Sequence, residues 1–124
     1  MRTAFGKNSV SALERAQRGV MAEDLAAQHL QANGLAVLRR NYRCKGGEID
    51  LIARDRATLV FVEVRLRSSE QFGGAGGSID WRKQARIVRA AGHFLLTARP
   101  SPCRFDVVLI GPSGLDWIRD AFQV

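Results

Sequence analysis

The sequence predicts an α/β fold in which a mixed central sheet is flanked by helices. Two observations lead to this class: strand-like runs follow one another in two groups, and a helix-like segment precedes each group. The resulting order is α-β-β-β-α-β-β, which suits helices packed against a sheet. The chain has 124 residues. This length fits one domain with a modest core, which we place at residues 11–124.

The first helix is predicted from its two ends. The sequence "SALE", from Ser11 to Glu14, fits a capping box, with Ser at the N-cap and Glu three residues later. The helix is expected to end at Asn33 and Gly34, because both residues tolerate the left-handed backbone conformation. Residues 1–10 precede it and are expected to form a flexible basic tail.

Three strands are expected next. They correspond to "LAVLRRNYR", "EIDLIAR" and "LVFVEVRLR", separated by a turn at Lys45-Gly46-Gly47 and by the tight connection "DRAT". The third run is rich in β-branched and aromatic residues, which favour strands. If the second and third runs form a hairpin, Asp50 and Glu63 become near neighbours on adjacent strands.

The second half of the chain begins with a glycine-rich stretch, "FGGAGGS" at residues 72–78, which predicts a mobile loop. A helix is expected over residues 79–98, stopped by Pro100 and Pro102. "RFDVVLI", a turn at "GPSG" and "LDWIRDAF" then predict two final strands. The helix is expected to face the core through the stripe Trp81, Ala85, Val88, Ala91 and Leu95.

The charge balance indicates a class of partner. Nineteen Lys and Arg against twelve Asp and Glu give a net charge of +7, with a sequence pI of about 10.7. Such an excess favours a polyanion, because neutralised phosphates release condensed counterions. A basic protein without any nucleic-acid role would have the same composition.

The remaining composition limits the class of protein. No apolar run is long enough to span a membrane and no signal-peptide pattern is present, so a cytoplasmic location is expected. Cys44 and Cys103 lie far apart and are expected to be free thiols. His29 and His93 are isolated, so the sequence indicates no zinc site.

Acidic residues stand where strands should be apolar. Asp50 and Glu63 interrupt the hydrophobic runs of two predicted strands. Two carboxylates held close together raise each other's pKa unless a cation lies between them, and Mg²⁺ prefers oxygen ligands. The alternative is a structural ion pair, in which Arg65 or a neighbouring arginine neutralises Glu63.

Glu23 is a third acid in an unexpected position. On a helical wheel it falls in the arc of Ala22, Ala26, Ala27 and Leu30. An acid on a packing face is costly unless it has a partner, although its carboxylate could also reach solvent at the border of the stripe. Three acids at positions where apolar residues are expected are better explained by one shared functional site than by three unrelated causes.

Five parts of the chain together carry a family resemblance. They are "MAEDLAAQHLQANGLAVLRRNYRCKGGEIDLIARD", "LVFVEVRLR", the helix containing Lys83, "RFDVVLI" and "IRDAF". They closely resemble the YraN family of small bacterial proteins, which is similar to the PD-(D/E)XK nuclease superfamily near the archaeal Holliday-junction resolvases. The match covers nearly the whole chain after about residue 18, and "GEIDLIA" followed by "FVEVR" is specific in this spacing.

The resemblance implies a fold, an activity and partners. The fold is a restriction-endonuclease-like α-β-β-β-α-β core with a mixed central sheet. The activity is metal-dependent hydrolysis of phosphodiester bonds by an endonuclease, on double-stranded, branched or repair-intermediate DNA. A homodimer is a further implication, because symmetric cleavage of a junction needs two sites.

The resemblance also implies roles for single residues. Asp50 corresponds to the acid of the PD element, although Ile49 stands in place of the proline. Glu63 corresponds to the second acid, Arg65 to the lysine, and Glu23 to a helix acid of the resolvase-like branch. Asp50 and Glu63 would hold Mg²⁺ or Mn²⁺, and Glu23 would complete the acidic shell. The metal would activate a water for in-line attack.

Arg65 departs from the usual lysine and leaves the activity open. Arginine stays protonated in proteins, so it cannot act as a base, but it could clamp a phosphate and stabilise transition-state charge. One reading is a working nuclease with Arg65 as an electrostatic aid. The other is a catalytically weak or inactive module that binds nucleic acid or protein and retains the fold. In a third reading the acids only make structural ion pairs.

Two basic clusters are candidate contacts for nucleic acid. One belongs to the helix predicted over residues 79–98 and the other precedes "GEIDLIA". Their members are Arg82, Lys83, Arg86, Arg89, Arg39, Arg40, Arg43 and Lys45. Such residues would position a phosphate backbone without reading its sequence, although a solvated helix face has the same pattern. The sequence shows no aromatic stacking platform, so Trp81 and Trp117 are expected in the core or at an interface.

Overall fold

The computed structural model of the protein describes residues 11–67 and 79–124. These residues form α2 (Ala12–Ala32), β1 (Ala36–Cys44), β2 (Gly47–Asp55), β3 (Thr58–Leu66), α4 (Trp81–Leu95), β4 (Cys103–Gly111) and β5 (Gly114–Phe122). This order is the predicted one, and the α/β class is consistent with a restriction-endonuclease-like core. The predicted tail at residues 1–10 and the glycine loop at residues 72–78 lie outside the described residues.

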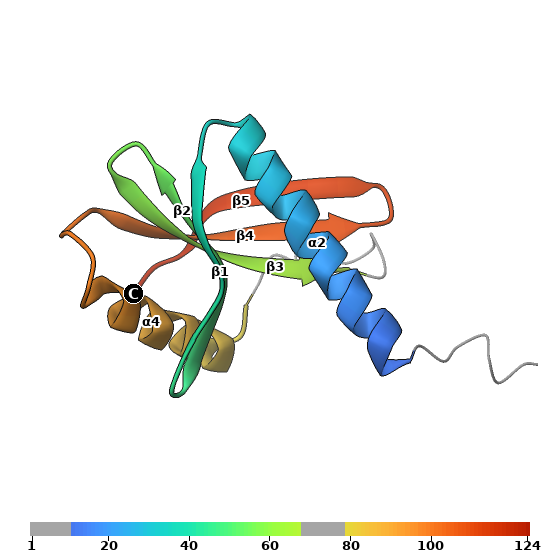
Figure 1. Ribbon diagram of the computed structural model, residues 1–124, viewed down its shortest axis with the longest axis horizontal. Helices are drawn as coiled ribbons and strands as arrows, with labels where there is room; N and C mark the ends of the chain where they lie inside the picture. Colours follow the sequence, from blue (N-terminus) through green and yellow to red (C-terminus); the bar gives the residue numbers. More distant parts are fainter. Residues whose placement is uncertain (1–10, 68–78) are drawn as a thin grey trace, which may run out of the picture.

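The strands form one five-stranded mixed sheet in the order β1-β2-β3-β4-β5. β3 and β4 run parallel, and the other neighbouring pairs are antiparallel. Parallel neighbours cannot be joined by a tight turn, and α4 belongs to the long connection between β3 and β4. In Figure 1, α2 runs diagonally across the view, while α4 lies apart from it beside the turn that joins β1 to β2.

Two hydrophobic clusters cover the two faces of the sheet, and β3 contributes to both in alternation. Leu59 and Phe61 pack in the cluster that contains the buried residues of α4. Val60 and Val62 pack in the cluster that contains Leu30 and the other buried residues of α2. This period of two is what a strand buried on both faces requires. The packing face predicted for α2 is confirmed, since its buried residues are Ala22, Ala26, Ala27 and Leu30.

The predicted ends of α2 are also confirmed. Ser11 Oγ accepts a 3.0 Å hydrogen bond from the Glu14 N–H, and the Ser11 N–H donates a 3.1 Å bond to Glu14 Oε1. These two bonds make a complete capping box. At the other end only Gly34 adopts the left-handed conformation, with φ of 91°, whereas Asn33 has φ of −99°.

α4 is shorter than the helix predicted over residues 79–98, and part of the predicted stripe is wrong. Asp80 is its N-cap, and Asp80 Oδ1 accepts a 2.9 Å hydrogen bond from the Lys83 N–H. Trp81 is 72% exposed and Ala85 is exposed as well. The buried residues are Ile87, Ala90 and Ala91, with Val88 and Leu95 partly buried beside them.

Close backbone packing against Gly47 explains this difference. A Cβ atom on Gly47 would lie 2.5 Å from the Arg86 carbonyl oxygen and 2.9 Å from the Ala90 backbone nitrogen. The glycine at the start of β2 therefore lets one turn of α4 approach the sheet, and that turn fixes which side of the helix is buried. A helical wheel contains no information on this contact.

A buried polar network joins β2, β4 and β5. The fully buried carboxylate of Asp106 accepts hydrogen bonds from Arg104 Nε at 3.0 Å, Trp117 Nε1 at 3.0 Å and the Asp120 N–H at 2.9 Å. Arg104 Nη1 also pairs with Asp55 Oδ2 at 3.0 Å. These bonds satisfy a charge that would otherwise be very costly to bury.

Two further expectations concern the chain as a whole. Neither α2 nor α4, the two helices in the described part of the chain, is long and apolar enough to cross a membrane. Cys44 and Cys103 are free thiols, as predicted.

Candidate functional site

Asp50 lies where the pairing between β2 and β3 stops. The paired positions run from Asp55 with Thr58 to Leu51 with Val62. At the following position, Asp50 Oδ2 accepts a 2.8 Å hydrogen bond from the backbone N–H of Val64. The carboxylate of Asp50 thus accepts a hydrogen bond from a β3 backbone group that β2 no longer pairs with. This bond holds the side chain of Asp50 close to Glu63, the residue before Val64.

The alternation of side chains along β2 is also interrupted at Asp50. Ile49 packs in the α4-side cluster, whereas Leu51 packs in the α2-side cluster. Residues two apart in a regular strand share a face, so the chain turns about its axis between these two positions. This irregularity is consistent with the hydrogen bond of Asp50, whose carboxylate points to the backbone of β3 and not to either face of the sheet.

Glu63 of β3 is buried and carries the largest electrostatic perturbation of the site. Its burial raises its pKa, and the negative charge of Asp50 raises it further, to about 8, although Lys83 acts in the opposite direction. The charged form of Glu63 is therefore disfavoured in the free protein, and the nearby ammonium group of Lys83 offsets part of this cost. The positive charge near Asp50 and Glu63 is therefore too small to keep the pKa of Glu63 at its ordinary value.

Glu23 of α2 reaches the same region through Asn41 of β1. Asn41 Nδ2 donates a 3.0 Å hydrogen bond to Glu23 Oε1. Burial raises the pKa of Glu23, and the charge of Asp50 raises it further. The three acids predicted from the sequence are thus brought into one electrostatic neighbourhood.

Asn41 is a site residue that the sequence did not reveal. It lies across from Asp50 in the pairing of β1 with β2, between the partners Arg40–Leu51 and Tyr42–Ile49. Its φ of 52° lies in the left-handed region, which asparagine tolerates better than most residues. An asparagine inside a predicted strand was the available signal, but it carries no information on which acid its amide contacts.

The ion pair that the structure gives Glu63 comes from α4. Lys83 Nζ lies 3.6 Å from Glu63 Oε2. The sequence had placed Lys83 among the nucleic-acid contacts and had given the position of the lysine to Arg65, which lies partly buried on β3. Lys83, from the first turn of α4, therefore lies beside Glu63 and is a second candidate for the cation that the resemblance assigned to Arg65.

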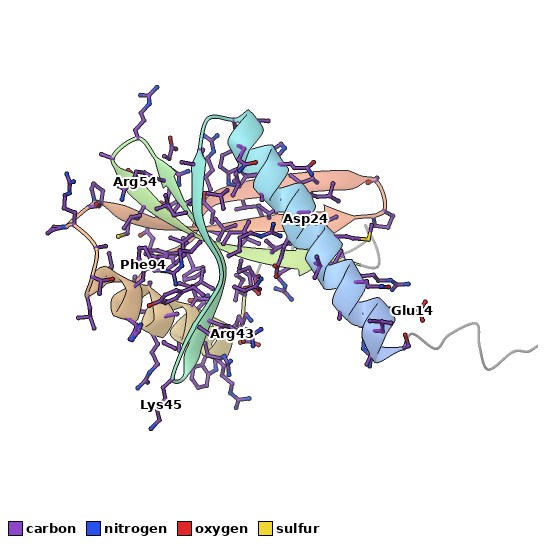
Figure 2. The ribbon with its side chains drawn as sticks, viewed as in Figure 1. Glu14, Asp24, Arg43, Lys45, Arg54 and Phe94 are labelled. Atoms are coloured by element: carbon purple, nitrogen blue, oxygen red, sulfur yellow. The ribbon has the colours of Figure 1, made fainter. Side chains whose placement is uncertain are left out.

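The two predicted basic clusters lie next to each other. Figure 2 shows Arg43 and Lys45 at the end of the β1–β2 hairpin that lies beside α4. Arg89 of α4 lies over the turn itself, since a Cβ on Gly46 would be 3.0 Å from Arg89 Cδ. The end of the hairpin and the outer side of α4 therefore form one basic surface.

Several members of the basic clusters already contact other side chains. Arg40 Nη2 pairs with Asp24 Oδ1 at 2.6 Å, and Arg86 Nη2 pairs with Glu48 Oε1 at 2.8 Å. The guanidinium carbons of Arg39 and Arg82 lie 5.1 Å and 5.3 Å from the ring centres of Tyr42 and Trp81. All four arginines are exposed, so these contacts leave their outer surfaces accessible.

The donor chemistry fits a hard divalent cation held by two carboxylates. In the part of the chain that the structure describes, no group of three or more His, Cys, Asp and Glu side chains is placed to hold a metal ion. Asp50 and Glu63 supply two oxygen donors, which is a common number for Mg²⁺ because it keeps several waters. The raised pKa of Glu63 is the electrostatic sign that added positive charge would be favourable here.

Comparisons with known proteins add a family. The family described as Uncharacterised protein family UPF0102 matches residues 22–110. A UPF0102 protein of Dechloromonas aromatica is 58% identical over 106 residues, which cover 86% of this chain and 88% of the relative. A UPF0102 protein of Saccharophagus degradans is 52% identical over 111 residues, which cover 87% of this chain and 94% of the relative. The match to the family includes every residue of the acidic site and both basic clusters.

Proposed function

The chain belongs to the UPF0102 family, and we propose that its function is metal-dependent endonucleolytic cleavage of DNA. The observation that carries this proposal is the juxtaposition of Asp50 and Glu63 at the end of the β2–β3 pairing. Glu63 has a pKa of about 8 although Lys83 Nζ lies 3.6 Å from it, so this ion pair does not offset the burial of Glu63 and the charge of Asp50. Groups with strongly shifted pKa values cluster at functional sites.

Each residue of the site has a distinct task in this proposal. Asp50 and Glu63 hold Mg²⁺ or Mn²⁺, and the Val64 N–H keeps the carboxylate of Asp50 in place. The metal, when bound, supplies Lewis-acid charge toward the phosphodiester and its attacking water. Glu23 adds negative charge at the border of the site and is oriented by Asn41.

The basic surface supports DNA as the substrate. Arg43, Lys45 and Arg89 are exposed at the end of the β1–β2 hairpin and on the adjacent part of α4, where they can contact the phosphates of a bound duplex. Phosphate contacts give affinity and position without sequence preference. We propose double-stranded or branched DNA as the substrate class. For a symmetric junction, two copies of the chain would supply one site each.

Cleavage assays test the proposal directly. Linear duplex and four-way-junction DNA are incubated with the protein and Mg²⁺ or Mn²⁺, in parallel with the variants Asp50→Ala and Glu63→Ala. Asp116→Ala is the matched control, because this surface acid pairs only with Arg67 in the described contacts and is 67% exposed. The expected result is cleavage by the wild type and by Asp116→Ala, and loss of cleavage by more than about a hundredfold in the two site variants.

A non-catalytic DNA-binding module is the second candidate, and Arg65 is the observation that favours it. An arginine on β3 cannot serve as a base. If the wild type binds DNA without cutting it, Arg65→Lys tests whether the site is only disabled, and recovered cleavage would show that it is. Equal residual cleavage by the wild type and both alanine variants would instead indicate a contaminating nuclease and would contradict the proposed function.

A further inference from the structure

We infer that Lys83 is an exchangeable ligand of this site: it pairs with Glu63 in the free protein and moves to a DNA phosphate when Glu63 binds a divalent cation. The inference rests on the proposed function, because it needs the same carboxylate pair and the same substrate class. It assigns the role of the active-site cation to a residue of α4 instead of to Arg65 of β3.

The backbone of Lys83 is fixed while its ammonium group is loosely held. The Lys83 N–H donates a 2.9 Å hydrogen bond to the N-cap side chain of Asp80, which anchors the first turn of α4. The distance of 3.6 Å from Nζ to Glu63 Oε2 is longer than that of a charge-assisted hydrogen bond, which is about 2.7–2.9 Å. Four rotatable bonds connect the anchored backbone to this weakly bound group, so a small torsional change moves it.

The exposure of the two partners is unequal. The side chain of Lys83 is 33% exposed, whereas that of Glu63 is 9% exposed. Among the described residues, Lys83 therefore reaches from the surface down to a buried carboxylate. Its neighbour on the helix, Arg82, is exposed and belongs to the basic surface on which a phosphate backbone would lie.

Electrostatics gives the exchange a direction. With Glu63 bound to a divalent cation, the positive charge of the metal would cancel most of the attraction between the carboxylate and Lys83. A DNA phosphate at the mouth of the site offers the ammonium group a new anionic partner.

The exchange predicts that Lys83 contributes to DNA affinity only when the carboxylates hold a cation. The experiment measures the anisotropy of a fluorescent short duplex in EDTA and in Ca²⁺, which suits a binding assay without turnover. Lys83→Met is compared with Arg82→Gln, a matched control from the same turn of α4. We expect Lys83→Met to weaken binding about tenfold in Ca²⁺, the effect of one charge-assisted contact, and less than about twofold in EDTA. Arg82→Gln should weaken binding equally in both buffers.

A second background makes the test independent of folding defects. In Glu63→Gln the lysine has lost its ion pair with Glu63, so this pair no longer competes with DNA in either buffer. Lys83→Met added to Glu63→Gln should then weaken DNA binding equally in Ca²⁺ and in EDTA. Unequal losses in that background would overturn the exchange, because they would place the calcium dependence elsewhere.

The remaining outcomes separate this inference from the proposed function. An equal effect of Lys83→Met in both buffers, no effect in either, or a wild type whose DNA affinity does not respond to Ca²⁺ would overturn the exchange. Cleavage of DNA by the wild type together with any of these results would leave the nuclease standing without it. A calcium-dependent effect of Lys83→Met in a protein that never cleaves would uphold the exchange and overturn the proposed nuclease.

Discussion

The backbone N–H of Val64 donates a 2.8 Å hydrogen bond to Oδ2 of Asp50, just beyond Leu51 and Val62, the last paired residues of β2 and β3. The bond fixes the side chain of Asp50 against the backbone of Val64, the residue that follows Glu63. The side chain of Asp50 is therefore held in place beside Glu63. The pairing of β2 with β3 therefore brings the charges of Asp50 and Glu63 close enough to repel each other.

Asp50→Asn should lower the pKa of Glu63 below its value of about 8, because the negative charge of Asp50 contributes to the increase. The asparagine keeps a carbonyl oxygen that can accept from Val64, so the local backbone is expected to stay in place. Titration of the Glu63 carboxyl carbon by NMR in EDTA measures the change. Asp116→Asn serves as the control for the loss of one surface charge. An unchanged pKa in Asp50→Asn would mean that burial alone shifts Glu63.

The raised pKa of Glu63 makes the metal-free protein less stable as pH rises. Between the ordinary value of 4.5 and about 8, the folded state binds a proton at Glu63 that the unfolded state has released. The stabilising effect is therefore complete below pH 4.5 and is lost as pH rises through about 8. Glu63→Gln should remove this dependence and be more stable than the wild type above pH 8 by a few kcal/mol. Urea unfolding in EDTA at a series of pH values measures it, and parallel curves for the two proteins would contradict it.

Gly47→Ala should destabilise the protein and displace α4. The added Cβ would lie 2.5 Å from the Arg86 carbonyl oxygen, a backbone atom that cannot move alone. The expected loss is about 1–3 kcal/mol in the free energy of unfolding. Gly92→Ala is the matched control within α4, because a Cβ at Gly92 meets nothing within 4 Å and should stabilise the helix by up to about 1 kcal/mol. Equal thermal melting points for the two variants would refute the close-packing argument.

Asp106→Ala should be among the most destabilising substitutions in the described part of the chain. It would leave Arg104, Trp117 and the Asp120 N–H without their shared acceptor, at a cost of about 3–5 kcal/mol. Asp116→Ala removes an exposed acid paired with Arg67 and should cost less than about 1 kcal/mol. Chemical denaturation compares the two, and a small effect of Asp106→Ala would show that the network adds little net stability.

Replacing Arg82, Arg86 and Arg89 together by Gln should reduce the salt dependence of DNA binding. Each lost phosphate contact lowers the slope of log K against log salt by about 0.9 on duplex DNA. We expect a reduction of about 1–3, because Arg86 is partly engaged by Glu48. Binding titrations at several salt concentrations measure the slope. A slope equal to that of the wild type would remove this stripe from the DNA-binding surface.

Local patterns were enough to predict the order of the elements. The capping box at Ser11 and the turn at Gly34 define α2, and the alternating apolar residues of β3 define its two buried faces. The buried face of α4 was partly mispredicted because it depends on contact with Gly47, a residue distant in the sequence. Trp81, which the predicted stripe placed facing the core, is exposed at the start of the helix.

The site was predictable where its residues break a pattern and unpredictable where they follow one. Asp50, Glu63 and Glu23 stood out as acids among apolar neighbours, and the structure brings them together. Lys83 had no such contrast, because a lysine on a helix with several arginines fits a solvated face. Asn41 contacts Glu23 across elements, and no spacing rule connects the two residues.

Among the strands that the structure describes, β1 and β5 have one neighbour each, and such edge strands can offer backbone groups to the strands of other molecules. β1 carries Arg39, Arg40 and Arg43 along this open edge and has a register shift between Val37 and Arg39. β5 carries charged residues and has a shift in its own pairing with β4. Charges and bulges of this kind discourage edge-to-edge aggregation. Arg39, Arg40 and Arg43 on β1 thus also help to prevent this edge strand from pairing with a strand of another molecule.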